Sequence, residues 1–222
     1  MKHWIDEIET IDNNGILYWV RKGNEIDRQV FDETVLDDVY RLESLRGKGI
    51  EYAIDLGGNI GMTAQRIIET LLVPCVSVEP MLGNFNLLNK VARHNERAIP
   101  VLGAFSPKGD KNFLTTDHHV AANRLAEEGT PVLGFSAEDI LLKLAGGNNN
   151  TFFLKMDIEG MEPEALNAFL PLLGGTYIAG EWHYDSQPVL DVLKKYGCKN
   201  IEILPDRLGG KDTGMFFATK GI

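Results

Sequence analysis

Two hydrophobic periods alternate along most of the chain. Short apolar runs such as TFFLKMD (151–157) are typical of parallel strands that are buried on both faces. Between them lie segments with helical spacing, several of which begin near a serine or a proline. This alternation predicts a parallel sheet with helices on both faces. Strands are expected at 51–55, 73–78, 98–103, 151–157 and 176–181, and helices at 62–72, 82–95, 137–144, 163–173 and 188–196.

The C-terminal part of the chain breaks this alternation. The runs CKNIEILP (198–205) and TGMFFATK (213–220) both have strand character, and a glycine-rich segment joins them. Two such runs around a short turn indicate a hairpin. The sequence therefore predicts an antiparallel hairpin as the last element of the sheet.

The N-terminal part differs as well. Residues 16–31 are expected to form a hairpin that turns at 22–24, and a helix is expected from about 34 to 45. We therefore expect an N-terminal hairpin-and-helix cap over residues 1–48 and a main domain over 49–222, together forming one compact unit. The aromatic residues of the cap are expected to pack it onto the domain; they are Trp4, Tyr18 and Trp19.

Composition narrows the class of protein. The 222 residues are 44% hydrophobic and 24% charged, which suits one soluble domain with a sizeable core. The net charge of −10 argues against nucleic acid as the main partner, because a phosphate backbone requires clustered Lys and Arg. No run approaches the roughly 18 apolar residues of a membrane span. The N-terminus lacks the apolar run of a signal peptide. We expect a cytoplasmic protein with a small-molecule partner, and the oligomeric state stays open.

The two cysteines fit a reducing compartment. Cys75 and Cys198 lie far apart and lack the CxxC spacing of a redox or metal motif. They are therefore interpreted as ordinary thiols, although the sequence leaves a disulfide between them open.

A glycine-rich turn within IDLGGNIGM (54–62) joins the first main strand to the next helix. In a dinucleotide fold, the middle glycine of such a turn lets a pyrophosphate approach the backbone. When the turn is aligned on Gly57 and Gly61, that position is Asn59, whose side chain would crowd a pyrophosphate, and Asp55 would repel it. The Asp55 carboxylate suits the ammonium and sulfonium groups of S-adenosylmethionine (SAM), which carries no phosphate, and Asn59 can hydrogen-bond to it.

An acid follows at the end of the second main strand. Glu79 lies about twenty residues past the glycines, where a doubly wound fold places an acid on the ribose hydroxyls. Alternatively, the glycines only form a tight turn and Glu79 only ends a strand in solvent. The predicted SAM site consists of Asp55, Gly57, Asn59, Gly61, Glu79, Pro80, Ala104 and Asp157.

Three motifs together resemble the FkbM family of SAM-dependent methyltransferases. They are IDLGGNIG (54–61), VEPMLGNFNLLNKVARHN (78–95) and LKMDIEGMEPEAL (154–166), and the resemblance covers nearly the whole chain. One departure is Gly58, where alanine is more usual, and it is expected to matter little. The resemblance implies an α/β, class I methyltransferase (Rossmann-like) fold with seven strands, mostly parallel and with an antiparallel last strand. It also implies methyl transfer to oxygen, commonly a hydroxyl of a sugar, glycolipid or secondary metabolite.

Candidate catalytic groups end two neighbouring strands. Methyl transfer from a sulfonium requires the acceptor oxygen, methyl and sulfur in line, and a base can remove the hydroxyl proton. Open α/β sheets bind ligands at the carboxyl ends of their strands. Asp157 and Glu159 follow one strand and are expected to contact SAM or the acceptor. His183 ends the next strand and is a candidate base, with Glu181 orienting it. Alternatively, the acids only oppose a helix dipole and the histidine is structural.

Other polar residues of the chain suggest further roles. The acids and His183, with Asp185, can ligate a divalent ion, but their spacing matches no stereotyped motif and we expect no required metal. Lys155 is unusual inside an apolar strand and is expected to pair with one of the acids that follow it. His118 and His119 are expected in an exposed loop.

The leading interpretation is a SAM-dependent O-methyltransferase that acts on a small hydroxylated acceptor. An NAD-linked oxidoreductase is an alternative, against which Asn59 and Asp55 both count. A SAM-binding regulatory protein without an acceptor site is a second alternative. The sequence leaves open the identity of the acceptor and whether methylation goes to oxygen or nitrogen.

Overall fold

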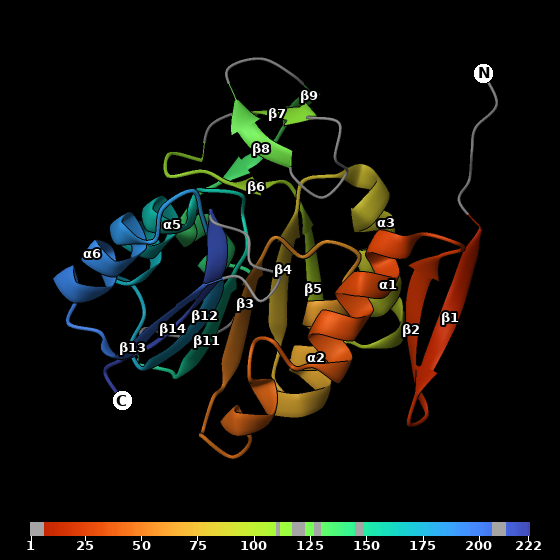
Figure 1. The fold of residues 1–222 in the computed structure, drawn as a ribbon, viewed down its shortest axis with the longest axis horizontal. Helices are drawn as coiled ribbons and strands as arrows, with labels where there is room; N and C mark the ends of the chain where they lie inside the picture. Colours follow the sequence, from red (N-terminus) through yellow and green to blue (C-terminus); the bar gives the residue numbers. More distant parts are fainter. Residues whose placement is uncertain (1–6, 110–111, 117–122, 127–129, 145–148, 206–211) are drawn as a thin grey trace.

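A seven-stranded sheet with helices on both faces forms the centre of the molecule (Figure 1). The computed structural model describes residues 7–109, 112–116, 123–126, 130–144, 149–205 and 212–222. The strands of the main sheet are β3 (Tyr52–Leu56), β4 (Cys75–Glu79), β5 (Ala98–Leu102), β11 (Phe152–Met156), β12 (Thr176–His183), β13 (Lys199–Pro205) and β14 (Thr213–Lys220). Their order across the sheet is β13-β14-β12-β11-β3-β4-β5.

The strand directions confirm the predicted topology. Strands β12, β11, β3, β4 and β5 pair in parallel, whereas β14 runs antiparallel to both of its neighbours. The predicted terminal hairpin is therefore β13 and β14. The register places Lys155 of β11 beside Asp55 of β3 on one side and beside Ala179 of β12 on the other. The carboxyl ends of the parallel strands meet at one edge of the sheet, where the predicted site lies.

Each central strand contributes to two hydrophobic cores, because successive side chains of a strand point to opposite faces. The helices are α2 (Met62–Leu71) and α3 (Leu82–His94) on one face, and α4 (Ala137–Leu141), α5 (Glu162–Phe169) and α6 (Gln187–Lys195) on the other. In β11, Phe152 and Leu154 pack into the core beneath α5 and α6, whereas Phe153 packs into the core beneath α2 and α3. Burial of each such side chain stabilises the fold by about 1.5–3 kcal/mol.

The N-terminal elements differ from the prediction. Strands β1 (Ile8–Asn13) and β2 (Ile16–Arg21) form a hairpin, and α1 (Glu25–Phe31) follows it. The predicted hairpin over 16–31 is therefore wrong. Asn14 and Gly15 take positive φ angles of 56° and 85°, which the two-residue turn of a tight hairpin favours. Asn24 instead begins α1, since its side chain accepts a hydrogen bond from the backbone N–H of Asp27.

The helix predicted from about 34 to 45 is also wrong. A π-helical turn (Asp32–Leu36) continues directly from α1, and a separate 3₁₀ turn (Leu42–Leu45) follows. Asp38 and Arg41, between the two turns, both have positive φ angles, which interrupt a right-handed helix. The side chain of Asp38 accepts hydrogen bonds from the backbone N–H groups of Leu42 and Glu43 and so stabilises the start of the 3₁₀ turn.

The N-terminal unit packs directly on the glycine turn. Tyr18, Val20 and Phe31 form a buried cluster with Ile60 and Met62, which flank Gly61. The hydroxyl of Tyr18 donates to Glu69 of α2, and the ring of Trp19 lies 4.7 Å from that of His94. Both aromatic residues thus pack the N-terminal unit onto the main domain, while Trp4 lies outside the described residues. The division at residue 48 stays a prediction.

A smaller sheet stands beyond the edge at which β5 ends, at the top of the view in Figure 1. Its strands are β7 (Asn112–Thr116), β8 (Asn123–Ala126) and β9 (Thr130–Val132). Two further short strands, β6 (Ala104–Phe105) and β10 (Gly134–Phe135), pair in parallel beneath it. His118 and His119 lie outside the described residues.

Two general expectations are tested by the described residues. Cys75 and Cys198 are both free thiols, so they do not form the disulfide that the sequence left open. None of the helices in the described ranges combines the length and the hydrophobicity that crossing a membrane requires.

Candidate active site

Gly57 brings the glycine turn into close contact with the segment that follows β11. Its φ angle is +79°, and a Cβ atom at this position would lie 1.9 Å from the backbone oxygen of Asp157. Gly61, with a φ angle of +91°, packs closely against α3, since a Cβ there would lie 2.9 Å from Cα of Leu88. Both glycines are therefore required by the packing of the turn on its neighbours. Their contact with a cofactor stays a prediction.

Gly58 is also tightly constrained. A Cβ atom at Gly58 would lie 2.1 Å from Oγ of Ser77, and this hydroxyl donates a 2.7 Å hydrogen bond to Oδ2 of Asp55. An alanine would displace the hydroxyl and disturb that hydrogen bond. Alanine here thus requires Ser77 to move, and the expectation that the departure at Gly58 matters little stays a prediction.

Asp55 supports the turn from inside the sheet. Its side chain is fully buried, accepts from Ser77 and lies 3.1 Å from Nζ of Lys155. Lys155 also donates to the carbonyl oxygens of Leu56 and Gly57, at 3.3 and 2.7 Å. The prediction that Asp55 meets the cationic groups of the cofactor needs correction, because both of its oxygens face partners within the protein. Lys155 likewise pairs with Asp55 rather than with the acids that follow β11.

Glu79 connects the glycine turn to the start of α3. Its carboxylate accepts hydrogen bonds from the backbone N–H of Asn59 at 2.8 Å and of Met81 at 2.7 Å. Burial raises the pKa of Glu79 to about 7, although these two hydrogen bonds lower it. Pro80 follows directly, and Ala104 lies close by in β6, because the N–H of Gly103 donates to the carbonyl oxygen of Glu79. The structure thus brings four predicted cofactor residues together: Asn59, Glu79, Pro80 and Ala104.

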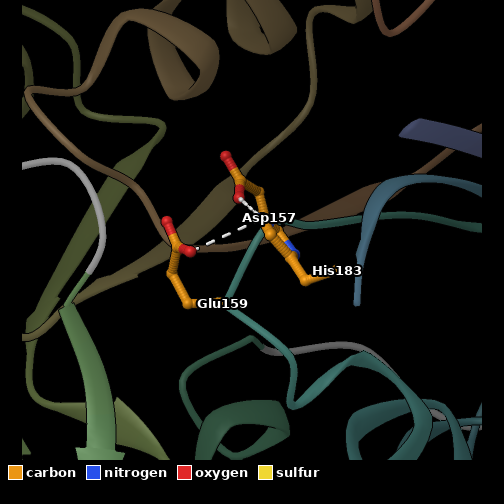
Figure 2. A group of neighbouring side chains, drawn as sticks. All are labelled: Asp157, Glu159 and His183. Carbon is orange, nitrogen blue, oxygen red and sulfur yellow. Dashed lines mark ion pairs between the residues drawn. The ribbon is translucent and has the colours of Figure 1, made fainter. Parts of the chain in front are cut away.

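Asp157, Glu159 and His183 converge at the neighbouring strand ends and form what we call the acid–histidine cluster (Figure 2). Asp157 follows β11, Glu159 lies in the turn before α5, and His183 is the last residue of β12. Nε2 of His183 lies 3.8 Å from Oδ1 of Asp157 and 3.5 Å from Oε2 of Glu159. All three predicted catalytic residues therefore share one site.

Glu162 fixes the ring of His183. Its Oε1 lies 3.0 Å from Nδ1 of His183, and its carboxylate accepts from the backbone N–H groups of Ile158 and Gly160. Glu162 is fully buried at the start of α5. The prediction that Glu181 orients His183 is thus wrong. The sequence leaves open whether Glu162 has a functional role or only opposes a helix dipole, and its position as the first residue of α5 is the available signal.

Charge crowding shifts the pKa values in the cluster. Burial disfavours the imidazolium form of His183, but the hydrogen bond to Glu162 and the surrounding carboxylates outweigh it and raise the pKa of His183 to about 9. Burial and the charge of Asp157 raise the pKa of Glu159 to about 7. The charge of Asp157, together with burial, raises the pKa of Glu181 to about 8. Negative charge is therefore in excess at this edge of the sheet, which favours a positively charged occupant.

Two further side chains border the cluster. The buried hydroxyl of Tyr40, from the N-terminal unit, donates to Oε1 of Glu181 at 3.4 Å. The ring of Tyr184 covers the turn, since a Cβ at Gly160 would lie 2.8 Å from Cε2 of Tyr184. Asp185 is exposed and accepts from the backbone N–H of Gln187 at the start of α6. Tyr40 carried no signal in the sequence, because its proximity to the site depends on how the N-terminal unit packs.

Comparisons with known proteins establish the fold class. No family model matches the chain, and no curated protein matches it either. Among solved structures, TYW2 of M. jannaschii in complex with AdoMet is similar at a TM-score of 0.57 and 10% identity, over 96% of this chain and 85% of that one. TYW2 of P. horikoshii in complex with MeSAdo has a TM-score of 0.53 at 12% identity, over 96% and 70% of the two chains.

A third solved structure, Trm5b of Pyrococcus abyssi, has a TM-score of 0.51 at 11% identity and covers 96% of this chain and 55% of its own. Together with the strand order, these similarities confirm a class I methyltransferase, Rossmann-like fold. Identities this low show the fold alone. Membership of the FkbM family stays a prediction.

Proposed function

We propose that this protein is a SAM-dependent methyltransferase that transfers the methyl group of SAM to a hydroxyl of a small acceptor. The observation that carries the proposal is the direct contact between the glycine turn and the acid–histidine cluster. The carbonyl oxygen of Asp157 occupies the space beside Gly57, and the N–H of Asp157 donates to the carbonyl oxygen of Leu56. A donor held on the turn would thus present its methyl group beside the cluster.

The residues near the turn suit the parts of SAM. The carboxylate of Glu79 can accept hydrogen bonds from the ribose hydroxyls, as the acid at this position does in doubly wound folds. Pro80 follows Glu79, and Ala104 follows Gly103, whose N–H donates to the carbonyl oxygen of Glu79, so both can provide apolar contacts for the adenine. Asn59 and Asp157 provide polar groups for the methionine part. Two structural neighbours with the same fold bind AdoMet or MeSAdo, which supports a donor of this chemistry here.

We assign binding of the acceptor to the acid–histidine cluster. In the reaction, the acceptor oxygen bonds to the methyl carbon, the S–C bond breaks, and S-adenosylhomocysteine leaves with the electron pair on sulfur. Nε2 of unprotonated His183 can take the hydroxyl proton, with Glu162 holding the ring in place. Asp157 and Glu159 would position the acceptor hydroxyls. The resemblance to the FkbM family supports oxygen as the methylated atom.

Binding and transfer test the proposal separately. Calorimetry should show SAM and S-adenosylhomocysteine binding with one site per chain, and no comparable binding of NAD. Radiolabelled SAM should then transfer its methyl group to members of a panel of sugars, glycolipids and phenolic metabolites. Preferential binding of NAD would overturn the proposal. Binding of SAM without transfer to any hydroxylated or amine acceptor would favour a regulatory SAM-binding protein.

A further inference from the structure

We propose that the acid–histidine cluster binds one divalent metal ion through Oδ1 of Asp157, Oε2 of Glu159 and Nε2 of His183. These three atoms lie within 4.8 Å of one another. This inference replaces our expectation from the sequence that no metal is required. The ion-binding step is independent of the proposed function, whereas the role of the ion in methyl transfer rests on it.

The tautomer of His183 carries the first part of the argument. Glu162 is fully buried and already accepts two backbone hydrogen bonds, so its Oε1 acts as an acceptor toward Nδ1 of His183. Nδ1 therefore keeps its proton, so the proton that leaves the ring is the one on Nε2, and Nε2 of the neutral ring then carries the lone pair. That lone pair faces the oxygens of Asp157 and Glu159. When a metal ion replaces the Nε2 proton, three acceptor atoms converge on that ion.

The low exposure of the His183 side chain limits which groups can contact its Nε2. The side chain of His183 is only 9% exposed, and its Nε2 has no hydrogen-bond partner within the described part of the chain. Nε2 is not among the fully buried unpartnered side-chain atoms of the described residues, so a partner from solvent can reach it. The partner must be positively charged or a donor, because the two nearby groups are carboxylates.

One proton satisfies the cluster poorly. A proton on Nε2 gives a single N–H, which faces two oxygens at 3.5 and 3.8 Å. Both separations exceed the roughly 2.7–3.2 Å of a good hydrogen bond. Donor atoms about 2.1 Å from one metal ion lie roughly 3.0–3.4 Å from each other, so small side-chain rotations suffice to complete a metal site.

The surroundings of His183 match those of metal-binding histidines. Such residues usually donate their second ring N–H to a carboxylate, which fixes the ring and raises its basicity. Glu162 makes this contact with Nδ1 of His183. Two carboxylates and one imidazole suit a divalent ion that accepts both oxygen and nitrogen ligands, such as Mn²⁺. Three protein ligands also leave coordination positions open for an acceptor oxygen.

The ion changes how the proton leaves the acceptor. Without it, Nε2 of His183 is the base. With it, Nε2 is a ligand, and a hydroxyl bound to the ion has a lowered pKa and releases its proton to water. The oxygen then attacks the methyl carbon as the S–C bond breaks. Adjacent hydroxyls on the acceptor can fill two of the open positions, so we expect acceptors with vicinal oxygens to be favoured.

Mn²⁺ added to the chelator-treated full chain provides the test. Electron paramagnetic resonance should show one bound Mn²⁺ per chain with a Kd below about 1 mM. The spin-echo signal should contain the modulation of a directly bound nitrogen, and this modulation should disappear in His183→Gln. Asp157→Asn and Glu159→Gln should each weaken binding by about tenfold or more. Glu164→Gln, which removes an exposed acid in the first turn of α5, is the matched control and should bind normally.

The outcomes separate this inference from the proposed function. Mn²⁺ binding that lacks the nitrogen signal, or that survives all three cluster variants, would overturn the site. So would absence of stoichiometric binding by Mn²⁺, Mg²⁺ and Zn²⁺, each tested alone, in protein that still binds SAM. If the ion binds as described but SAM does not, the metal site stands and the proposed methyltransferase function fails. Because the side chain of Glu159 is 22% exposed, Glu159→Gln gives a readout even if substitution of buried His183 impairs folding.

Discussion

Nζ of Lys155 lies 3.1 Å from Oδ1 of Asp55, and both side chains are buried. The same ammonium group donates to the carbonyl oxygen of Gly57. The buried charge of Asp55 raises the pKa of Lys155, although burial alone lowers it, so the lysine stays charged at neutral pH. The ion pair therefore fixes the backbone of the glycine turn through the hydrogen bond from Lys155 to Gly57.

Lys155→Met should destabilise the protein by about 3–5 kcal/mol, because it leaves Asp55 as an uncompensated buried charge. Chemical denaturation measures this loss. The double variant Lys155→Met with Asp55→Asn should recover part of it, since the remaining amide is neutral. SAM affinity should fall in the single variant, because the carbonyl oxygens of the turn lose their donor. A single variant as stable as the wild type would contradict the supporting role of the pair.

Gly58→Ala should destabilise the protein by about 1–3 kcal/mol, since the added methyl group displaces the hydroxyl of Ser77. Adding Ser77→Ala to this variant should relieve the clash, leaving mainly the smaller cost of the lost hydrogen bond to Asp55. Gly83→Ala is the matched control: nothing lies within 4 Å of a Cβ at this position in α3, and the change should be neutral or stabilising. Equal unfolding midpoints for Gly58→Ala and Gly83→Ala would argue against the clash.

SAM affinity should depend on pH through Glu79. The carboxyl has a pKa of about 7, raised from its ordinary value by burial, so it is mostly neutral below that pH. In the proposed cofactor site the ionised form would accept hydrogen bonds from the ribose hydroxyls, and affinity should therefore rise as the pH increases through about 7 and fall as it decreases. Each pKa unit by which SAM lowers this value corresponds to about 1.4 kcal/mol. Calorimetry at about pH 6 and about pH 8 measures the change.

Glu79 variants provide the control for this pH dependence. Glu79→Gln should lose the part of the dependence that arises from the carboxyl, and Glu79→Ala should weaken SAM binding by about 1–3 kcal/mol. A wild-type profile that coincides with that of Glu79→Gln would assign the pH dependence to the ligand. Unchanged affinity in Glu79→Ala would remove this residue from the cofactor site.

His183→Ala should slow methyl transfer by about 10²–10⁴-fold if the ring is the base, while SAM affinity stays near normal. Glu162→Gln should also reduce the rate, because it weakens the acceptor that fixes Nδ1. His94→Ala alters an exposed histidine at the end of α3 and should retain the full rate. The rates are measured with the acceptor found in the panel assay. Full activity of His183→Ala would exclude this residue from the mechanism.

The main sheet could be predicted because its signal is local. Apolar runs such as 152–156 are buried on both faces and interrupt the helical period, so they stand out in one dimension. The turn of the N-terminal hairpin could not be located from the sequence, because residues 14–15 and residues 22–24 both contain an asparagine and a glycine and are both candidates for a turn. Only the structure shows that the first pair makes the hairpin turn and that Asn24 caps a helix.

The site was predicted as a set of residues, but the contacts among them were not. His183 and the acids stood at strand ends, which is a local observation. The contact between Glu162 and His183 joins the start of a helix to the end of the next strand, so it depends on how α5 packs. The Asp55–Lys155 pair follows from the register of β3 and β11, and these strands become neighbours only through the order of the sheet. Residues that are far apart in the sequence and meet only in the fold cannot be paired from the sequence alone.

The two halves of the proposed site, the glycine turn and the acid–histidine cluster, are anchored in different cores. Ile60 and Met62 of the glycine turn pack against side chains of the N-terminal unit. The helix α5, which supplies Glu162, instead packs in the core on the opposite face of the sheet. Substitutions can therefore accumulate around one half while the other keeps its shape. Under the proposed function, changes on the α5 side would alter the acceptor that is bound, while the contacts of the glycine turn with the donor would stay the same.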